Sequence, residues 1–120
     1  MTKPEGIWSV RLTATAEADI QNILAWTLEH FGDRQARLHA ETLSDALEAL
    51  TAGPTTIGVK ERTDIAKSLF ALHVARAGRK GRHFVLFRVQ ADRQRRWIEV
   101  LRLLHDAMDL PGHVADAAGL

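Results

Sequence analysis

A change in hydrophobic spacing at Pro54 decides most of what this chain can fold into. Before Pro54, apolar side chains recur every three or four residues, which is the spacing of one face of a helix. After residue 68, apolar side chains alternate with polar ones or run continuously, as they do in strands. The pattern predicts helices over 15–31 and 34–52, followed by an antiparallel three-strand meander from about 68 to 105.

The beginning of the chain completes this prediction. Residues 8–14 alternate and predict a first strand, after which Thr15 is a suitable helix N-cap. The connection at Gly32 is so short that the two helices must fold back on each other. We therefore expect one α+β domain over 1–120, with the order β-α-α-β-β-β and a helical hairpin packed on a small, mainly antiparallel sheet in two layers. The tail after about 108 is expected to be loosely ordered.

The composition excludes several classes of site. The chain has no cysteine, so it contains neither disulfides nor thiolate metal sites. Its six histidines show no recognised ligand spacing, and there is no glycine-rich phosphate loop, so we expect no metal and no cofactor. No signal peptide and no membrane-spanning run are evident, which leads us to expect a cytoplasmic protein.

Charge is distributed unevenly along the chain. Residues 1–60 carry five Lys/Arg against eight Asp/Glu, whereas residues 61–120 carry eleven against seven. The basic excess lies between Arg76 and Arg102. Such a region attracts an acidic partner or nucleic acid, although charged turn residues that only keep hairpins soluble produce the same pattern.

Three stretches carry a resemblance to a known family. The stretch VRLTATAEADIQNILAWTLEHFG, with Asp19 and Trp26, resembles the strand and first helix of ParE toxins. The stretch ALEALTAGPTTIG resembles the exit of their second helix, and RHFVLFRV with WIEVLRLLHDAMDL resembles their last two strands. Together the matches span about 8–113, so the chain resembles the RelE/ParE superfamily and its ParE branch in particular.

This resemblance implies the toxin of a type II toxin–antitoxin module that acts on DNA gyrase. It also implies a ParD-like antitoxin as partner, in a hetero-oligomer, and a role in plasmid stabilisation. The alternatives are a ribosome-dependent mRNA endonuclease of the RelE branch, and an inactive family member that only binds its partner.

An RNase needs groups that activate the ribose hydroxyl, stabilise the phosphate and protonate the leaving oxygen. The chain has no tyrosine, which removes one frequent participant in this family. The remaining candidates are Arg82, Arg102 and His105. Strict alternation places Arg102 on one face with Ile98, Val100 and Leu104, and His105 on the other with Trp97, Leu101 and Leu103. Unless a bulge or turn after Leu104 brings His105 round, the three do not converge. We favour the gyrase hypothesis because of the ParE-like stretches and the missing tyrosine.

Gyrase poisoning needs a contact surface and no catalytic set. The predicted target-binding residues lie in the basic turns and at the end of the last strand: Arg79, Lys80, Arg93, Arg95, Arg96, His105 and Asp106. The antitoxin is expected to cover surplus apolar groups of the hairpin and to face nearby cations, at Trp26, Leu38, Arg76 and Arg88. Each of these residues has a purely structural alternative, as solvated charge or as core.

Overall fold

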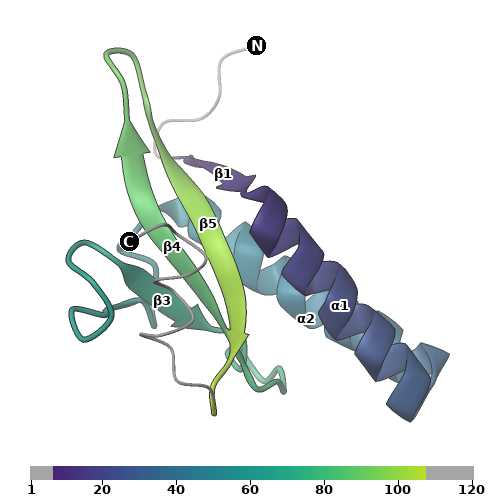
Figure 1. The fold of residues 1–120 in the computed structure, drawn as a ribbon. Helices are drawn as coiled ribbons and strands as arrows, with labels where there is room; N and C mark the ends of the chain where they lie inside the picture. The colour runs from purple at the N-terminus through teal and green to yellow at the C-terminus, as the bar shows by residue number, and fades with distance from the viewer. Residues whose placement is uncertain (1–6, 108–120) are drawn as a thin grey trace.

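The computed structural model describes residues 7–107, in which two helices pack against a five-stranded sheet (Figure 1). The elements in order are β1 (Ser9–Leu12), α1 (Ala14–Phe31), α2 (Asp33–Ala49), a 3₁₀ turn (Leu50–Ala52), β2 (Lys60–Glu61), β3 (Phe70–His73), β4 (His83–Ala91) and β5 (Arg96–His105). The α+β class and the mainly antiparallel sheet predicted from the sequence are confirmed. The predicted loose tail after 108 lies outside the described residues.

The sheet has the order β1-β5-β4-β3-β2, so the last strand lies inside it. Strands β3, β4 and β5 form the predicted antiparallel meander, and β1 pairs in parallel with β5, with Ser9 opposite Trp97. The two-residue strand β2 was not predicted. It pairs Lys60 and Glu61 with β3, in the segment between the predicted second helix and the predicted meander.

Helix α1 begins two residues earlier than the predicted cap requires. Thr13, not Thr15, occupies the N-cap, where its Oγ1 accepts a hydrogen bond from the Ala16 amide at 3.0 Å. The same hydroxyl donates to the Leu101 carbonyl at 3.0 Å. Thr13 therefore connects the start of α1 to β5. This hydrogen bond to a distant strand, in addition to the capping bond, explains why α1 begins after Thr13 and not after Thr15.

Helix α2 begins directly after Gly32, which has a φ of 87° and ends α1 by donating its amide to the Leu28 carbonyl. The positive φ favours glycine at this turn. The main core lies between the helices and the sheet, with Leu43, Leu50, Phe87 and Ile98 fully buried in it. A second apolar cluster occupies the opposite face of the sheet: Leu69, Ala71, Leu86, Leu101 and Leu104.

The exit of the helical hairpin packs against Trp8, which directly precedes β1. Gly53 has a φ of 98°, and a Cβ at this position would lie 2.6 Å from the Trp8 indole nitrogen. The Trp8 amide donates to the Thr51 carbonyl at 2.8 Å. Gly53, at the end of the helical pattern, therefore also leaves the space that the Trp8 ring occupies. Within residues 7–107, neither helix has the length and apolar character needed to cross a membrane.

Candidate functional site

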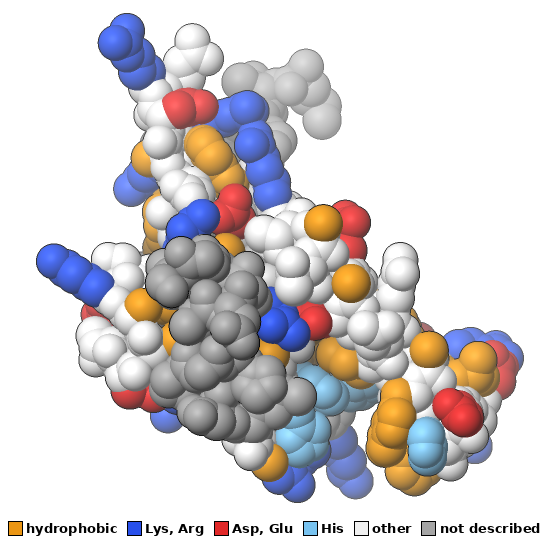
Figure 2. Space-filling view, in the orientation of Figure 1, with side chains coloured by type: hydrophobic (Ala, Val, Ile, Leu, Met, Phe, Trp, Pro, Cys, Tyr) orange, Lys and Arg blue, Asp and Glu red, His pale blue; other side chains and the backbone are white. Residues whose placement is uncertain are grey.

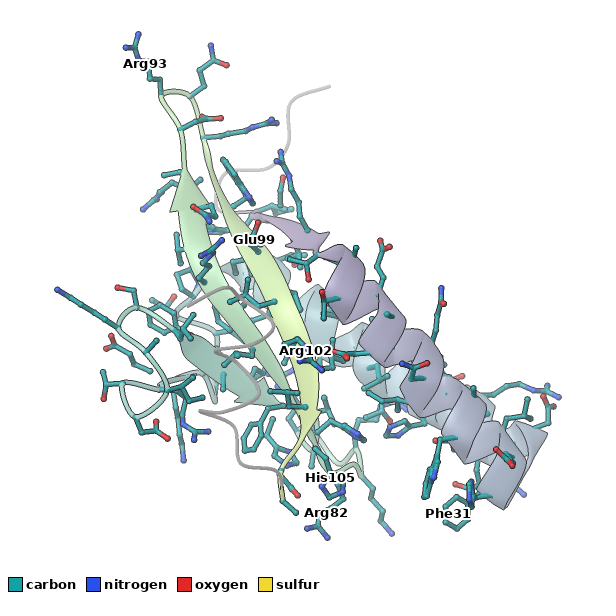
Figure 3. The ribbon with its side chains drawn as sticks, in the orientation of Figure 1. Phe31, Arg82, Arg93, Glu99, Arg102 and His105 are labelled. Carbon is teal, nitrogen blue, oxygen red and sulfur yellow. The ribbon has the colours of Figure 1, made fainter. Side chains whose placement is uncertain are left out.

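The far end of the helical hairpin and the connection between β3 and β4 enclose an open cleft of about 730 Å³. One wall comes from α1 and α2, and the other from residues 78–82 together with the end of β5. Figure 3 shows Phe31 on the helical side, across from Arg82 and His105. In the space-filling view, histidines lie beside the hollow, with hydrophobic side chains of the hairpin across from them (Figure 2).

The helical wall of the cleft is apolar and solvent-exposed. Trp26, Phe31 and Leu38 are 54, 63 and 43% exposed. The rings of Trp26 and Phe31 pack edge to face with their centroids 5.6 Å apart, and Trp26 also stacks on His30 at 4.3 Å. A two-layer domain gains nothing from leaving these groups in water, which makes this wall a candidate binding surface.

The opposite wall is held close to α2 by two features of residues 78–82. A Cβ at Gly81 would lie 2.6 Å from the Val74 side chain and within 4 Å of His39 and Thr42, so only glycine allows this approach. The Arg79 guanidinium lies 2.5 Å from an Asp45 oxygen and 3.6 Å from a Glu41 oxygen on α2. Arg79 is therefore already ion-paired, whereas Lys80 is exposed at the rim of the cleft.

Three histidines from three elements meet where the two walls join. The ring of His83 on β4 lies 5.6 Å from that of His39 on α2 and 5.3 Å from that of His105 on β5, centroid to centroid. Burial, together with the neighbouring His39 and His105, lowers the pKa of His83 to about 4, and burial also lowers the pKa of His39. At neutral pH, His83 is therefore uncharged. Its buried Nδ1 has no hydrogen-bond partner within residues 7–107.

Asp106 fixes the groups at the end of β5. Its carboxylate accepts hydrogen bonds from Arg82 Nε at 3.0 and 3.1 Å and lies 3.0 Å from His73 Nε2. The hydrogen bond with His73, followed by the Arg82 guanidinium, holds the pKa of Asp106 below its usual range in spite of partial burial. Asp106 thus positions two neighbours through its ionised form, and it is not a solvated charge.

The three residues proposed for an RNase mechanism do not share one site. Arg82 and His105 both line the cleft. Arg102 is instead bound to Asp19 of α1, to which its Nε and Nη2 donate at 2.7 and 3.0 Å. The Leu103 amide donates to the same carboxylate at 3.0 Å, so Arg102 is committed to the join between α1 and β5.

The predicted strict alternation along β5 is wrong because the strand contains a bulge. Leu86 pairs with Arg102 but Phe87 pairs with Val100, so Leu101 is an extra residue. Ile98, Val100 and Leu103 consequently belong to the main core, while Leu101 and Leu104 belong to the second cluster. The bulge lies before Leu104 and places His105 beside the helical hairpin.

The remaining predicted contact residues fall into separate places. Arg93, Arg95 and Arg96 lie at the turn between β4 and β5, at the opposite end of these strands from Arg82 and His105 (Figure 3). Arg88 donates to Glu99 at 2.8 Å, and Arg76 Nη2 lies 3.5 Å from the Ile57 carbonyl. Neither Arg76 nor Arg88 lines the cleft, whereas Trp26 and Leu38 do.

Three residues were missed from the sequence: Phe31 and His39, which line the cleft, and His83, whose ring contacts His39 and His105 beside it. Phe31 is part of the apolar stripe of the first helix and is its last residue before Gly32. That position was the available signal, because the end of a long helix extends beyond a small sheet and its apolar side chains are then left uncovered. The histidines carried no sequence signal, since their proximity depends on the packing of α2 against β4. Among the described residues, no group of three or more histidines and acids is placed to hold a metal ion.

Comparisons with known proteins agree with this architecture. Residues 10–110 match the family model described as ParE toxin of type II toxin–antitoxin system, parDE. The solved structure of a chromosomal ParDE toxin–antitoxin system from P. aeruginosa superposes with a TM-score of 0.66 at 18% identity, covering 84% of this chain and 98% of that one. A YoeB/ParE toxin from Agrobacterium tumefaciens gives a TM-score of 0.55 at 13% identity, covering 81% and 97%.

No match was found among curated protein sequences. The structural matches are too distant in sequence to show more than a shared fold. The family model, in contrast, extends over most of the sequence, from β1 to beyond β5. The chain belongs to the ParE toxin family of type II toxin–antitoxin systems.

Proposed function

We propose that the chain is a toxin neutralised by a ParD-like antitoxin, a segment of which occupies the cleft at the end of the helical hairpin. The exposed apolar wall formed by Trp26, Phe31 and Leu38 carries this proposal. Fully burying a side chain of this size contributes roughly 1.5–3 kcal/mol, and each is already about half buried, so covering all three would contribute roughly 3 kcal/mol.

The opposite wall indicates the chemistry of the segment. Lys80 is exposed there, and Arg82 is 69% exposed although it is paired with Asp106. An amphipathic segment with apolar anchors toward the hairpin and carboxylates toward Lys80 and Arg82 complements both walls. Arg76 and Arg88, which we expected to face the antitoxin, lie outside the cleft, so their contribution requires the segment to continue along the sheet.

Replacing both Trp26 and Leu38 with serine tests the docking site. We expect the affinity of the cognate antitoxin, measured by calorimetry, to fall at least 10-fold, because about 1.4 kcal/mol of lost apolar burial suffices for that change. Leu28→Ser is the matched control, since Leu28 is 51% exposed on α1 but does not line the cleft. Unchanged affinity of a folded double variant would place the antitoxin elsewhere.

We further propose that the toxin acts in the cytoplasm on DNA gyrase and is not an RNase. Membership of the ParE family supports this target, as does the commitment of Arg102 to Asp19, which leaves Arg82 and His105 without the third candidate. An RNase mechanism needs several groups around one phosphate. A gyrase poison needs only exposed contacts, which the chain offers at the cleft and at the β4–β5 turn.

Induction of the gene without its antitoxin separates the two mechanisms. DNA damage response and translation are monitored independently over the first minutes. Damage with intact translation supports gyrase as the target, whereas immediate translation arrest supports the mRNA endonuclease. If neither occurs and the antitoxin still binds, the chain is an inactive, interaction-only member of the family.

A further inference from the structure

The turn between β4 and β5 carries arginines arranged around two partly buried tryptophans. Strands β4 and β5 pair out to Ala91 and Arg96, and the parallel pairing of β1 with β5 begins only at Trp97. The end of this hairpin is therefore a two-stranded ribbon that projects beyond the rest of the sheet (Figure 1). Trp8 and Arg11 belong to the β1 segment, which lies beside this end of β5. We call these two residues and the residues of the hairpin end the ribbon tip: Trp8, Arg11, Arg93, Arg95, Arg96 and Trp97.

Three of these arginines lie over tryptophan rings. The Arg11 and Arg95 guanidinium carbons lie 4.5 and 6.0 Å from the centre of the Trp97 ring. The Arg96 guanidinium carbon lies 4.7 Å from the centre of the Trp8 ring. Stacking on an indole restricts the orientation of a guanidinium and leaves the N–H groups on its edge available to the oxygens of an anion such as phosphate.

The two tryptophans lie on opposite faces of the sheet. Trp8 packs against the main core, on the side of the helices. Trp97 precedes the core residue Ile98, so the alternation of a strand places its side chain on the face away from the helices. Of the ribbon's own arginines, Arg95 therefore lies on the face away from the helices and Arg96 on the helical face. Arg93 projects from the end of the ribbon (Figure 3).

Nearby acids do not cancel this charge. Asp92 Oδ1 accepts hydrogen bonds from the Gln94 and Arg95 amides, both at 2.9 Å, and so shapes the turn. Glu99 is paired with Arg88. Asp92 Oδ2 also lies 3.8 Å from Arg95 Nε, so it pairs with one of the four exposed arginines. The ribbon tip therefore keeps a local excess of positive charge.

We infer that the ribbon tip binds the phosphate backbone of duplex DNA by entering a groove, without reading base sequence. The major groove of B-DNA accepts a two-stranded ribbon and has phosphates along both of its edges. Cations on both faces of a narrow ribbon match two rows of phosphates. An acidic protein surface, in contrast, presents its charge from one side and would engage only one face. Arginine also binds phosphate with two parallel hydrogen bonds.

The inference goes beyond gyrase as a target and is tested without that enzyme. The full-length protein is titrated onto a fluorescein-labelled duplex of 20 base pairs, and anisotropy is recorded between 50 and 200 mM NaCl. Four phosphate contacts predict a slope of log affinity against log salt of about −3.6, which is a loss of roughly 100-fold over this range. We expect a dissociation constant on the order of 10 µM at 100 mM salt.

Arg93→Ala with Arg95→Ala should make the slope shallower by about two, because each lost arginine removes one phosphate contact. Arg34→Ala with Arg37→Ala is the matched control, since it removes the same charge from exposed positions of α2 and should leave the slope unchanged. Circular dichroism confirms that both double variants are folded.

Three results would overturn the inference. Equal losses in the two double variants would mean that only net charge matters. Binding of a single-stranded 20-mer as tightly as the duplex would exclude recognition of a groove. Displacement of the duplex by poly-glutamate at equal charge concentration would indicate an acidic protein as the partner.

Discussion

The ion pair between Asp19 and Arg102 determines whether Arg102 stabilises the fold or is free to act in catalysis. Removing Asp19 distinguishes these two roles. Asp19→Ala deletes a carboxylate that accepts from Arg102 Nε, Arg102 Nη2 and the Leu103 amide. The two side chains are 13 and 18% exposed. The substitution therefore leaves a largely buried guanidinium and one backbone amide without their partner.

The burial of this ion pair gives the expected loss of unfolding free energy in Asp19→Ala. Removing one partner of a fully buried ion pair costs about 3–5 kcal/mol. Since the pair between Asp19 and Arg102 is slightly exposed, we expect a loss of unfolding free energy near the lower end, about 3 kcal/mol. For a domain of this length, that corresponds to a fall in Tm of about 12 °C.

Urea unfolding followed by circular dichroism measures the loss, and Asp33→Ala is the control. Asp33 forms an ion pair with Arg37 in which both side chains are more than half exposed, so its removal should cost about 0.5 kcal/mol or less. Adding Arg102→Met to Asp19→Ala should recover about 2 kcal/mol, because no guanidinium is then left unpaired. If Asp19→Ala costs no more than the control, Arg102 is free, and its participation in an RNase site becomes plausible again.

Three further outcomes follow from other parts of the structure. The pKa of His83 is lowered to about 4 in the folded protein, so between pH 6.5 and 4 the unfolded chain binds more protons than the folded one. The free energy of unfolding should therefore decrease as the pH is lowered through this window. His83→Leu should flatten the profile of urea midpoint against pH. Gly53→Ala should cost about 2 kcal/mol or more, measured by thermal unfolding, because a side chain there combines a positive φ with a clash against Trp8. His105→Ala should largely preserve toxicity in an induction assay, whereas truncation after Leu104 should abolish it, since truncation also removes the carboxylate that holds Arg82; full detoxification by His105→Ala alone would favour an RNase.

Local periodicity predicted most of the fold because each element carries its own pattern. The helices were predicted to within three residues of their observed ends, and the meander from the change of period after Pro54. The predictions that were wrong concern features that depend on contacts between residues far apart in the sequence. Thr13 replaces Thr15 as the N-cap because its hydroxyl also reaches the Leu101 carbonyl, and no local pattern encodes that partner.

The candidate site was predictable in part for the same reason. Trp26 and Leu38 stood out because an apolar stripe on a short hairpin exceeded what a small sheet can cover. The bulge at Leu101 was not predictable, because RWIEVLRLLH is apolar on both faces and gives no register. Since the bulge shifts every later residue, the neighbours of His105 and the isolation of Arg102 could be known only from the folded chain.

The position of β5 in the sheet has a consequence for how the protein is made. Strand β1 pairs with β5, which is synthesised almost ninety residues later. Helices α1 and α2, in contrast, can contact each other as soon as both have emerged from the ribosome. We expect the helical hairpin to form first on nascent chains, and the sheet only after β5 has emerged. One wall of the cleft is then available to a partner during translation before the other wall exists, and nascent chains that stop before Arg96 lack the strand that joins β1 to β4.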